Sequence, residues 1–105
     1  MIESIFEHAA ECAPRECCGL VIEDGNDKRY IRMENISENE KSFEMNPLAF
    51  ASIQAISKIL YIVHSHYGED SRPSEHDINN CNTVGIPYFI VSYPNKDYTI
   101  LEPND

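Results

Sequence analysis

The segment from His64 to Asp77 has the pattern H-x-H-x7-S-x2-D, which constrains the fold more than any other feature of the sequence. An apolar, β-branched run, Ile59-Leu60-Tyr61-Ile62-Val63, precedes the two histidines, so we expect them at the end of a buried strand. Side chains two apart on a strand point to the same face, and two imidazoles on one face can bind one ion. Asp77 arrives from the next element as a third ligand. The pattern therefore predicts that a strand and a following helix meet at a metal site.

Two imidazoles and one carboxylate form a three-ligand zinc set that leaves a fourth position for water, as catalytic zinc sites do. We therefore expect His64, His66 and Asp77 to bind Zn²⁺. Ser74 suits the N-cap of a helix, which puts Asp77 in the first turn. The Ser74 hydroxyl could also donate to an oxyanion near the metal.

A zinc hydrolase also needs a base for the bound water, and no carboxylate beside the histidines is placed for this role. Glu16 stands out because it leads directly into the apolar segment Cys17-Cys18-Gly19-Leu20-Val21-Ile22, where an unpaired carboxylate is costly. Residue chemistry leaves three interpretations of Glu16 open: a catalytic base, a partner in a salt bridge, or a solvated strand end. The other two histidines lie outside this pattern. We expect His8 to be a solvated helix residue and His76 to be at most a neighbour of the ligands.

The length and net charge of the chain limit the number of domains and the kinds of partner that we expect. At 105 residues the chain is expected to form one domain, residues 1–105. The net charge of −10 argues against nucleic-acid and membrane partners. The N-terminus lacks a basic segment followed by an apolar run, so we expect a soluble protein made in the cytoplasm. The spacing of the four cysteines permits disulfides without requiring them, and burial as free thiols fits at least as well.

Periodicity and turn residues predict the element order helix, two strands, helix, strand, helix, two strands. The expected helices are 2–12, 47–58 and 74–83, and the strand that carries the histidines follows the second helix. The expected hairpins are 17–22 with 28–33, around Gly25-Asn26, and 87–93 with 98–101, around Pro94-Asn95. Residues 42–45 are expected as a short strand that closes the polar loop 34–41.

These residues resemble the JAMM metallopeptidases, also called the Mov34/MPN/JAB domain. The likeness lies in the H-S-H-x7-S-x2-D segment and in Pro14-x-Glu16-x-Cys18-Gly19-Leu20. In that family a glutamate on the first strand deprotonates zinc-bound water, two histidines and an aspartate bind zinc, and a serine stabilises the tetrahedral intermediate. The resemblance implies an α/β (α+β) fold, a cytidine-deaminase-like sandwich with a curved, mostly antiparallel sheet flanked by helices. It implies these roles: Glu16 and Ser74 catalytic, and His64, His66 and Asp77 zinc ligands.

Within the family, the likeness is to the JAMM domain of tailed-phage tail-assembly proteins and to small prokaryotic JAB peptidases. It includes Phe43-x-x-Asn46-Pro47, Arg72-Pro73-Ser74-Glu75-His76-Asp77 and the segment 85–92. The resemblance implies a zinc-dependent metallopeptidase or isopeptidase that hydrolyses a peptide or isopeptide bond in tail assembly or tail-tip function. Its expected partners are a peptide or protein substrate and phage tail-tip proteins, and its expected final location is a virion tail.

Two departures from the family pattern are visible. Tyr67 stands where the family usually has a proline, and the sequence stops at Asp105, where related tail proteins often continue into a cell-wall peptidase domain. The sequence also lacks the insertions with which eukaryotic relatives hold ubiquitin, so we do not expect a dedicated ubiquitin-chain hydrolase. Two alternatives stay open: a peptidase that trims a ubiquitin-like or sulfur-carrier protein, and a non-catalytic tail component with a zinc site.

Overall fold

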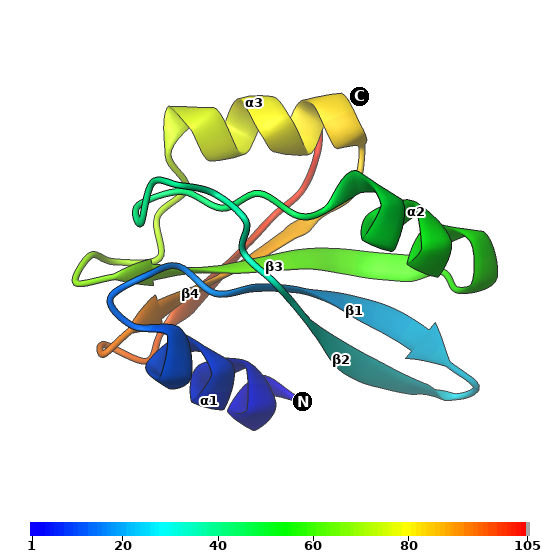
Figure 1. The fold of residues 1–105 in the computed structure, drawn as a ribbon, viewed down its shortest axis with the longest axis horizontal. Helices are drawn as coiled ribbons and strands as arrows, with labels where there is room; N and C mark the ends of the chain where they lie inside the picture. Colours follow the sequence, from blue (N-terminus) through cyan, green and yellow to red (C-terminus); the bar gives the residue numbers. More distant parts are fainter. Residues whose placement is uncertain (105) are drawn as a thin grey trace.

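One five-stranded sheet organises the fold, and a computed structural model describes residues 1–104 of the chain (Figure 1). The strands are β1 (Cys18–Asp24), β2 (Asp27–Met33), β3 (Ile59–Tyr67), β4 (Tyr88–Tyr93) and β5 (Tyr98–Leu101). They lie in the order β2-β1-β3-β4-β5. β3 and β4 pair in parallel, and the other neighbours are antiparallel. The mostly antiparallel sheet agrees with the expected α+β class.

Hydrophobic side chains of the central strands alternate between two cores, one on each face of the sheet. Along β1, Leu20 packs into one core and Val21 into the other. α1 (Ile2–Cys12) covers the Val21 face, and α2 (Pro47–Ile56) and α3 (Glu75–Val84) lie over the opposite face (Figure 1). Because both faces are covered, the central strands are nearly continuous apolar runs in the sequence.

The predicted helix starts and hairpins are confirmed. The Asn46 side chain accepts hydrogen bonds from the amides of Leu48 and Ala49, which caps α2 as its sequence indicates. The first hairpin turns through Gly25, whose φ of +62° suits glycine. As predicted, both histidines lie at the end of a strand, since β3 includes them and ends at Tyr67.

The prediction of a short strand at residues 42–45 is wrong. That segment is irregular and its backbone groups are bonded within the loop. The Asn35 side chain donates to the Ser42 carbonyl at 3.0 Å and accepts from the Glu44 amide at 3.1 Å. The Glu44 carbonyl accepts from the amide of Ile36 at 2.9 Å. The Asn35 side chain thus takes two of the bonds that a neighbouring strand would make.

The expectation for His8 is also wrong. His8 is buried, and its Nδ1 lies 2.6 Å from the Tyr30 hydroxyl on β2. It shares the buried side of α1 with Ile5 and Ala9, which sit three residues before it and one residue after it. Helical spacing therefore places this histidine against the sheet, where a hydrogen bond offsets its burial.

The cysteines are free thiols, and three of them, Cys17, Cys18 and Cys81, are buried. Cys12 is partly buried at the end of α1. None of the helices within residues 1–104 has the length and apolar character needed to cross a membrane. The free thiols agree with the expectation from the cysteine spacing.

Leu20 tests the core on the face covered by α2 and α3. Leu20→Ala should lower the free energy of unfolding by about 2 to 5 kcal/mol, because Leu20 is fully buried and its removal leaves a cavity. The matched control is Leu48→Ala, whose side chain is 79% exposed and should matter by less than about 0.5 kcal/mol. Urea unfolding monitored by circular dichroism measures both. Equal losses in the two variants would contradict the burial.

Candidate metal centre

β3 presents His64 and His66 on one side of the sheet, with ring centroids 5.2 Å apart. His64 is completely buried. Its ring stacks on Phe43 at a centroid distance of 4.5 Å and meets Tyr88 edge-on at 5.5 Å. Aromatic packing therefore fixes the orientation of the first predicted ligand.

Asp77 enters from the first turn of α3, where a capping box fixes it. The Asp77 amide donates to Oγ of Ser74 at 3.1 Å, and the Ser74 amide donates to Oδ2 of Asp77 at 2.9 Å. This reciprocal pair is the N-cap arrangement that the x2 spacing predicts. Ser74 is exposed, and because its Oγ accepts from Asp77, the hydroxyl proton remains available to a third group.

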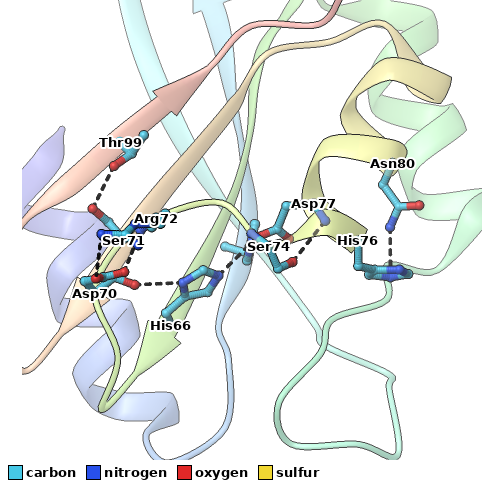
Figure 2. A network of polar contacts seen from close by, with 10 residues as sticks. His66, Asp70, Ser71, Arg72, Ser74, His76, Asp77, Asn80 and Thr99 are labelled. Atoms are coloured by element: carbon cyan, nitrogen blue, oxygen red, sulfur yellow. Dashed lines mark hydrogen bonds and ion pairs between the residues drawn. The ribbon is translucent and has the colours of Figure 1, made fainter.

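The three predicted ligands meet. Nε2 of His64 lies 3.0 Å from Oδ1 of Asp77, and Nε2 of His66 lies 3.2 Å from Oδ2. One ligand atom from each residue can be chosen so that all of them lie within 4.8 Å of one another, and all three residues are buried. Figure 2 shows His66 between Asp77 and the 70–72 loop, with Ser74 beside Asp77.

Two observations indicate that this group suits a metal ion. Both ring nitrogens of His64 are buried, and neither makes an aligned hydrogen bond, although Nε2 lies 3.0 Å from Oδ1 of Asp77. Buried nitrogens without a hydrogen bond are rare. Nδ1 of His66 donates to the Asp70 backbone carbonyl at 2.9 Å, which leaves Nε2 as the nitrogen that faces Asp77. A backbone carbonyl in this role commonly orients a metal-binding imidazole.

Without an ion, a proton on Nε2 of His66 links that ring to Asp77. Burial alone would raise the pKa of Asp77, but the two facing imidazoles hold it well below its usual range. Burial alone would lower the pKa of His66, but its bonds to Asp77 and to the Asp70 carbonyl raise it to about 9. Burial keeps the pKa of His64 below its usual value. The metal-free site therefore holds a carboxylate, one imidazolium and one neutral imidazole at pH 7.

Glu16 lies just before β1 and is 8% exposed. Glu16 makes no ion pair within the described part of the chain, which argues against the salt-bridge interpretation. Its burial argues against a solvated strand end. Burial, with smaller contributions from Asp77 and Glu69, raises its pKa to about 7, against the opposing effect of His66. A carboxyl group with this pKa can both accept and release a proton near neutral pH.

An open cleft of about 950 Å³ joins Glu16, Ser74 and the candidate ligands His66 and Asp77. The loop 39–43 lines one part of it, and residues of the segment 66–77 line another. His76 also lines the cleft, but its Nε2 lies 3.0 Å from the Asn80 side chain (Figure 2). As expected, His76 is a neighbour of the candidate ligands and no part of their group.

Three groups around the site were not found from the sequence. The Asp70 carbonyl orients His66, Asn35 donates to the Glu16 carbonyl, and Ser65 accepts from the Cys17 amide. Backbone carbonyls leave no trace in a sequence pattern, and Asn35 lies in a polar loop with no distinctive spacing. The position of Ser65 between the two histidines was the only available signal.

Comparison with known proteins places the chain in a family. The family described as prokaryotic homologs of the JAB domain matches residues 1–101. The chain belongs to this family. It is also 36% identical over 103 residues to tail tip assembly protein K of Escherichia phage N15. That match covers 97% of this chain but only 42% of the phage protein, so this JAB-family chain spans less than half of its relative.

Solved structures share the JAB-family fold. A Desulfitobacterium hafniense protein solved in solution has a TM-score of 0.71 at 26% identity, with 94% of this chain and 75% of the other covered. A JAB1/MPN domain protein from Archaeoglobus fulgidus has a TM-score of 0.66 at 23% identity, covering 97% and 83%. A structure described as a JAMM metalloprotease-like zinc site in the proteasome and signalosome has a TM-score of 0.59 at 22% identity, covering 96% and 80%. These likenesses confirm the JAMM/MPN-type fold.

The Glu16 carboxyl should make the stability of this JAB-family chain depend on pH. Its pKa is about 7 in the folded chain and near 4.5 in the unfolded chain. The protonated group therefore contributes stability that is fully present below pH 4.5 and is lost as the pH rises through 7. Relative to wild type, metal-free Glu16→Gln should gain about 2 to 3 kcal/mol of unfolding free energy between pH 4.5 and pH 8.

Urea unfolding in excess chelator at the two pH values measures this gain. Glu75→Gln at the exposed start of α3 is the matched control for the loss of a carboxyl group, and it should gain less than Glu16→Gln because Glu75 is not buried. A Glu16→Gln difference that stays constant with pH would contradict the shifted pKa.

Proposed function

We propose that this chain is a zinc-dependent metallopeptidase or isopeptidase that hydrolyses a peptide or isopeptide bond with an activated water. The observation that carries the proposal is the convergence of His64, His66 and Asp77, with two orphaned nitrogens on His64, beside the buried carboxyl of Glu16. All of these groups except His64 line one open cleft, which gives an extended substrate access to them. Membership of the JAB family supports the same activity.

His64, His66 and Asp77 would hold the ion as a three-ligand set with an open fourth position. When bound, zinc lowers the pKa of a coordinated water toward about 7 and polarises a carbonyl oxygen. The donor set of two imidazoles and one carboxylate is one that zinc favours. Because Nδ1 of His66 is bonded to the Asp70 carbonyl, Nε2 is the nitrogen that would bind the ion.

The residues of the chain itself would move the protons. Glu16 would take a proton from the attacking water and return it to the leaving amine, a role suited to its pKa of about 7. Ser74 would donate its free hydroxyl proton to the oxygen that becomes negative when the carbonyl is attacked. The capping box would keep Ser74 and Asp77 at a fixed separation during this step.

We place this activity in phage tail assembly or tail-tip function, with tail-tip proteins as partners and the virion tail as a destination. The support is the relative named tail tip assembly protein K, which is 36% identical and matches almost the whole chain. A purely structural zinc site in a tail component is the competing function. A structural zinc site does not explain why the Glu16 carboxyl is buried without an ion pair in the described chain.

Zinc binding is the first test. Wild-type protein loaded with zinc and then desalted should carry about one ion per chain by mass spectrometry of metals, because three ligands converge. His66→Ala should lose most of this zinc. His76→Ala, the matched control, should keep it, since His76 is bonded to Asn80. A wild-type chain that binds no zinc would overturn the proposal.

The second test is turnover by Glu16→Gln. This variant should bind zinc as wild type does but lose at least about 100-fold in kcat, because it cannot transfer the proton. A library of internally quenched peptides and isopeptides, assayed with the zinc-loaded protein, measures cleavage. Glu75→Gln is the control and should cleave at the wild-type rate. Cleavage by Glu16→Gln at that rate would show that the assigned base is wrong, whereas zinc binding without any cleavage by wild type would favour the structural alternative.

A further inference from the structure

The peptide group between Glu16 and Cys17 is bonded at both of its polar ends by side chains. The Glu16 carbonyl accepts a hydrogen bond from Nδ2 of Asn35 at 2.8 Å. The Cys17 amide donates to Oγ of Ser65 at 2.8 Å. One planar peptide unit is therefore held from a loop on one side and from β3 on the other.

Asn35 uses all of its bonding capacity. Its Nδ2 also donates to the Ser42 carbonyl at 3.0 Å, and its Oδ1 accepts from the amides of Ser37 at 3.0 Å and Glu44 at 3.1 Å. The same loop provides the Glu40 carbonyl, which accepts from the Glu16 amide at 3.2 Å. Asn35 thus joins the loop that lines the cleft to the backbone of the candidate base.

Ser65 joins the same peptide group to the metal-binding strand. It is 2% exposed and stands between His64 and His66. In addition to the bond to its Oγ, its amide donates to the Cys17 carbonyl at 3.1 Å. The regular strand β1 begins only at Cys18, so these bonds supply the order that the pairing of β1 supplies further along.

We propose that Asn35 and Ser65 are positioning residues that fix the Glu16–Cys17 peptide group and thereby aim the Glu16 carboxyl at the metal centre. The inference rests on the proposed function of Glu16 as the base. The Glu16 side chain makes no hydrogen bond within the described chain, so its position follows from its backbone and from packing. A peptide unit can rotate only through the dihedrals on either side of it, and bonds at both ends oppose that rotation.

Asn35→Asp tests the loop side of this arrangement. An aspartate keeps an acceptor for the Ser37 and Glu44 amides but places a second oxygen against the carbonyls of Glu16 and Ser42. We expect kcat to fall by about 10- to 100-fold, the loss typical of a catalytic group displaced by about 1 Å, with KM and zinc affinity changed by less than about threefold. Asn82→Asp is the matched control, because the Asn82 side chain accepts from the Asn104 amide and does not line the cleft, and it should retain wild-type kcat.

Ser65 gives an independent test with its own rescue. Ser65→Ala removes the acceptor for the Cys17 amide and should lower kcat by about tenfold or more. Ser65→Thr keeps the hydroxyl on a strand residue and should restore most of that loss. Ser52→Ala removes a hydroxyl that donates to the Leu48 carbonyl in α2, and it controls for the loss of a serine hydroxyl away from the cleft. If Asn35→Asp does not fold, comparison of Ser65→Ala with Ser65→Thr still tests the positioning role.

Two measurements do not depend on cleavage. In crystal structures of zinc-loaded Asn35→Asp and Ser65→Ala, the Glu16 carboxyl should move by about 1 Å or more or lose its order, with the ligand side chains unmoved. In Ser65→Ala, the Cys17 amide should exchange its hydrogen at least about tenfold faster than in wild type.

These readouts separate the inference from the proposed function. Absence of cleavage by wild type would remove the proposed function, while a displaced Glu16 in the variants would still support the positioning role. Variants with an unmoved Glu16 carboxyl, wild-type exchange at Cys17 and, where wild type cleaves, wild-type kcat would overturn the positioning role.

Discussion

The antiparallel pairing of β1 with β3 is the constraint on which the candidate site depends. Its register sets Cys18 opposite His64, and the bonds between Cys17 and Ser65 continue that alignment beyond the end of β1. Glu16 consequently reaches the side of His66, with which it is electrostatically coupled. A slip of one residue would turn both histidines to the other face of the sheet and replace them by Val63 and Ser65. The hydrophobic cores prevent this slip, because it would also exchange the residues that pack against α1 with those that pack against α2 and α3.

Burial shifts the pKa values of the acidic groups at the site, and the direction of each shift depends on the neighbouring charges. Glu16 and Asp77 are both nearly buried carboxyl groups, yet their pKa values move in opposite directions. Asp77 faces two imidazoles and stays ionised, whereas Glu16 has no such partner and its pKa rises to about 7. Two carboxyl groups in one cleft therefore suit two different tasks, ligand and proton carrier. The difference arises from which side chains the capping box of α3 and the register of β3 place beside each of them.

Sequence reasoning located the fold elements and the candidate ligands because both follow from short-range patterns. The spacing of His64, His66, Ser74 and Asp77 depends only on strand alternation and on helix capping, and the structure brings these residues together as that spacing predicts. Glu16 could be singled out, but its role could not be chosen, because its environment depends on a strand pairing across almost fifty residues of chain. The predictions of a strand at 42–45 and of a solvated His8 failed because single side-chain bonds decide both, and periodicity does not reveal such bonds. Asn35 bonds the segment 42–45 from within the same loop, and Tyr30 bonds His8 from a strand 22 residues away.

A proton in the metal-free site occupies the role that a metal ion would take. Asp77 faces Nε2 of both histidines, and if His66 were neutral, its bond to the Asp70 carbonyl would leave two lone pairs opposed. A proton on Nε2 removes that repulsion, which is why the pKa of His66 rises to about 9. A dication would remove the same repulsion and would also satisfy one of the two buried nitrogens of His64, Nε2, which a single proton on His66 cannot reach. Ion binding near neutral pH must therefore displace the proton of His66, so that affinity increases with pH until that proton is lost. The group of two histidines and one aspartate therefore suits either a proton or a metal ion, and binding of the ion would release the proton.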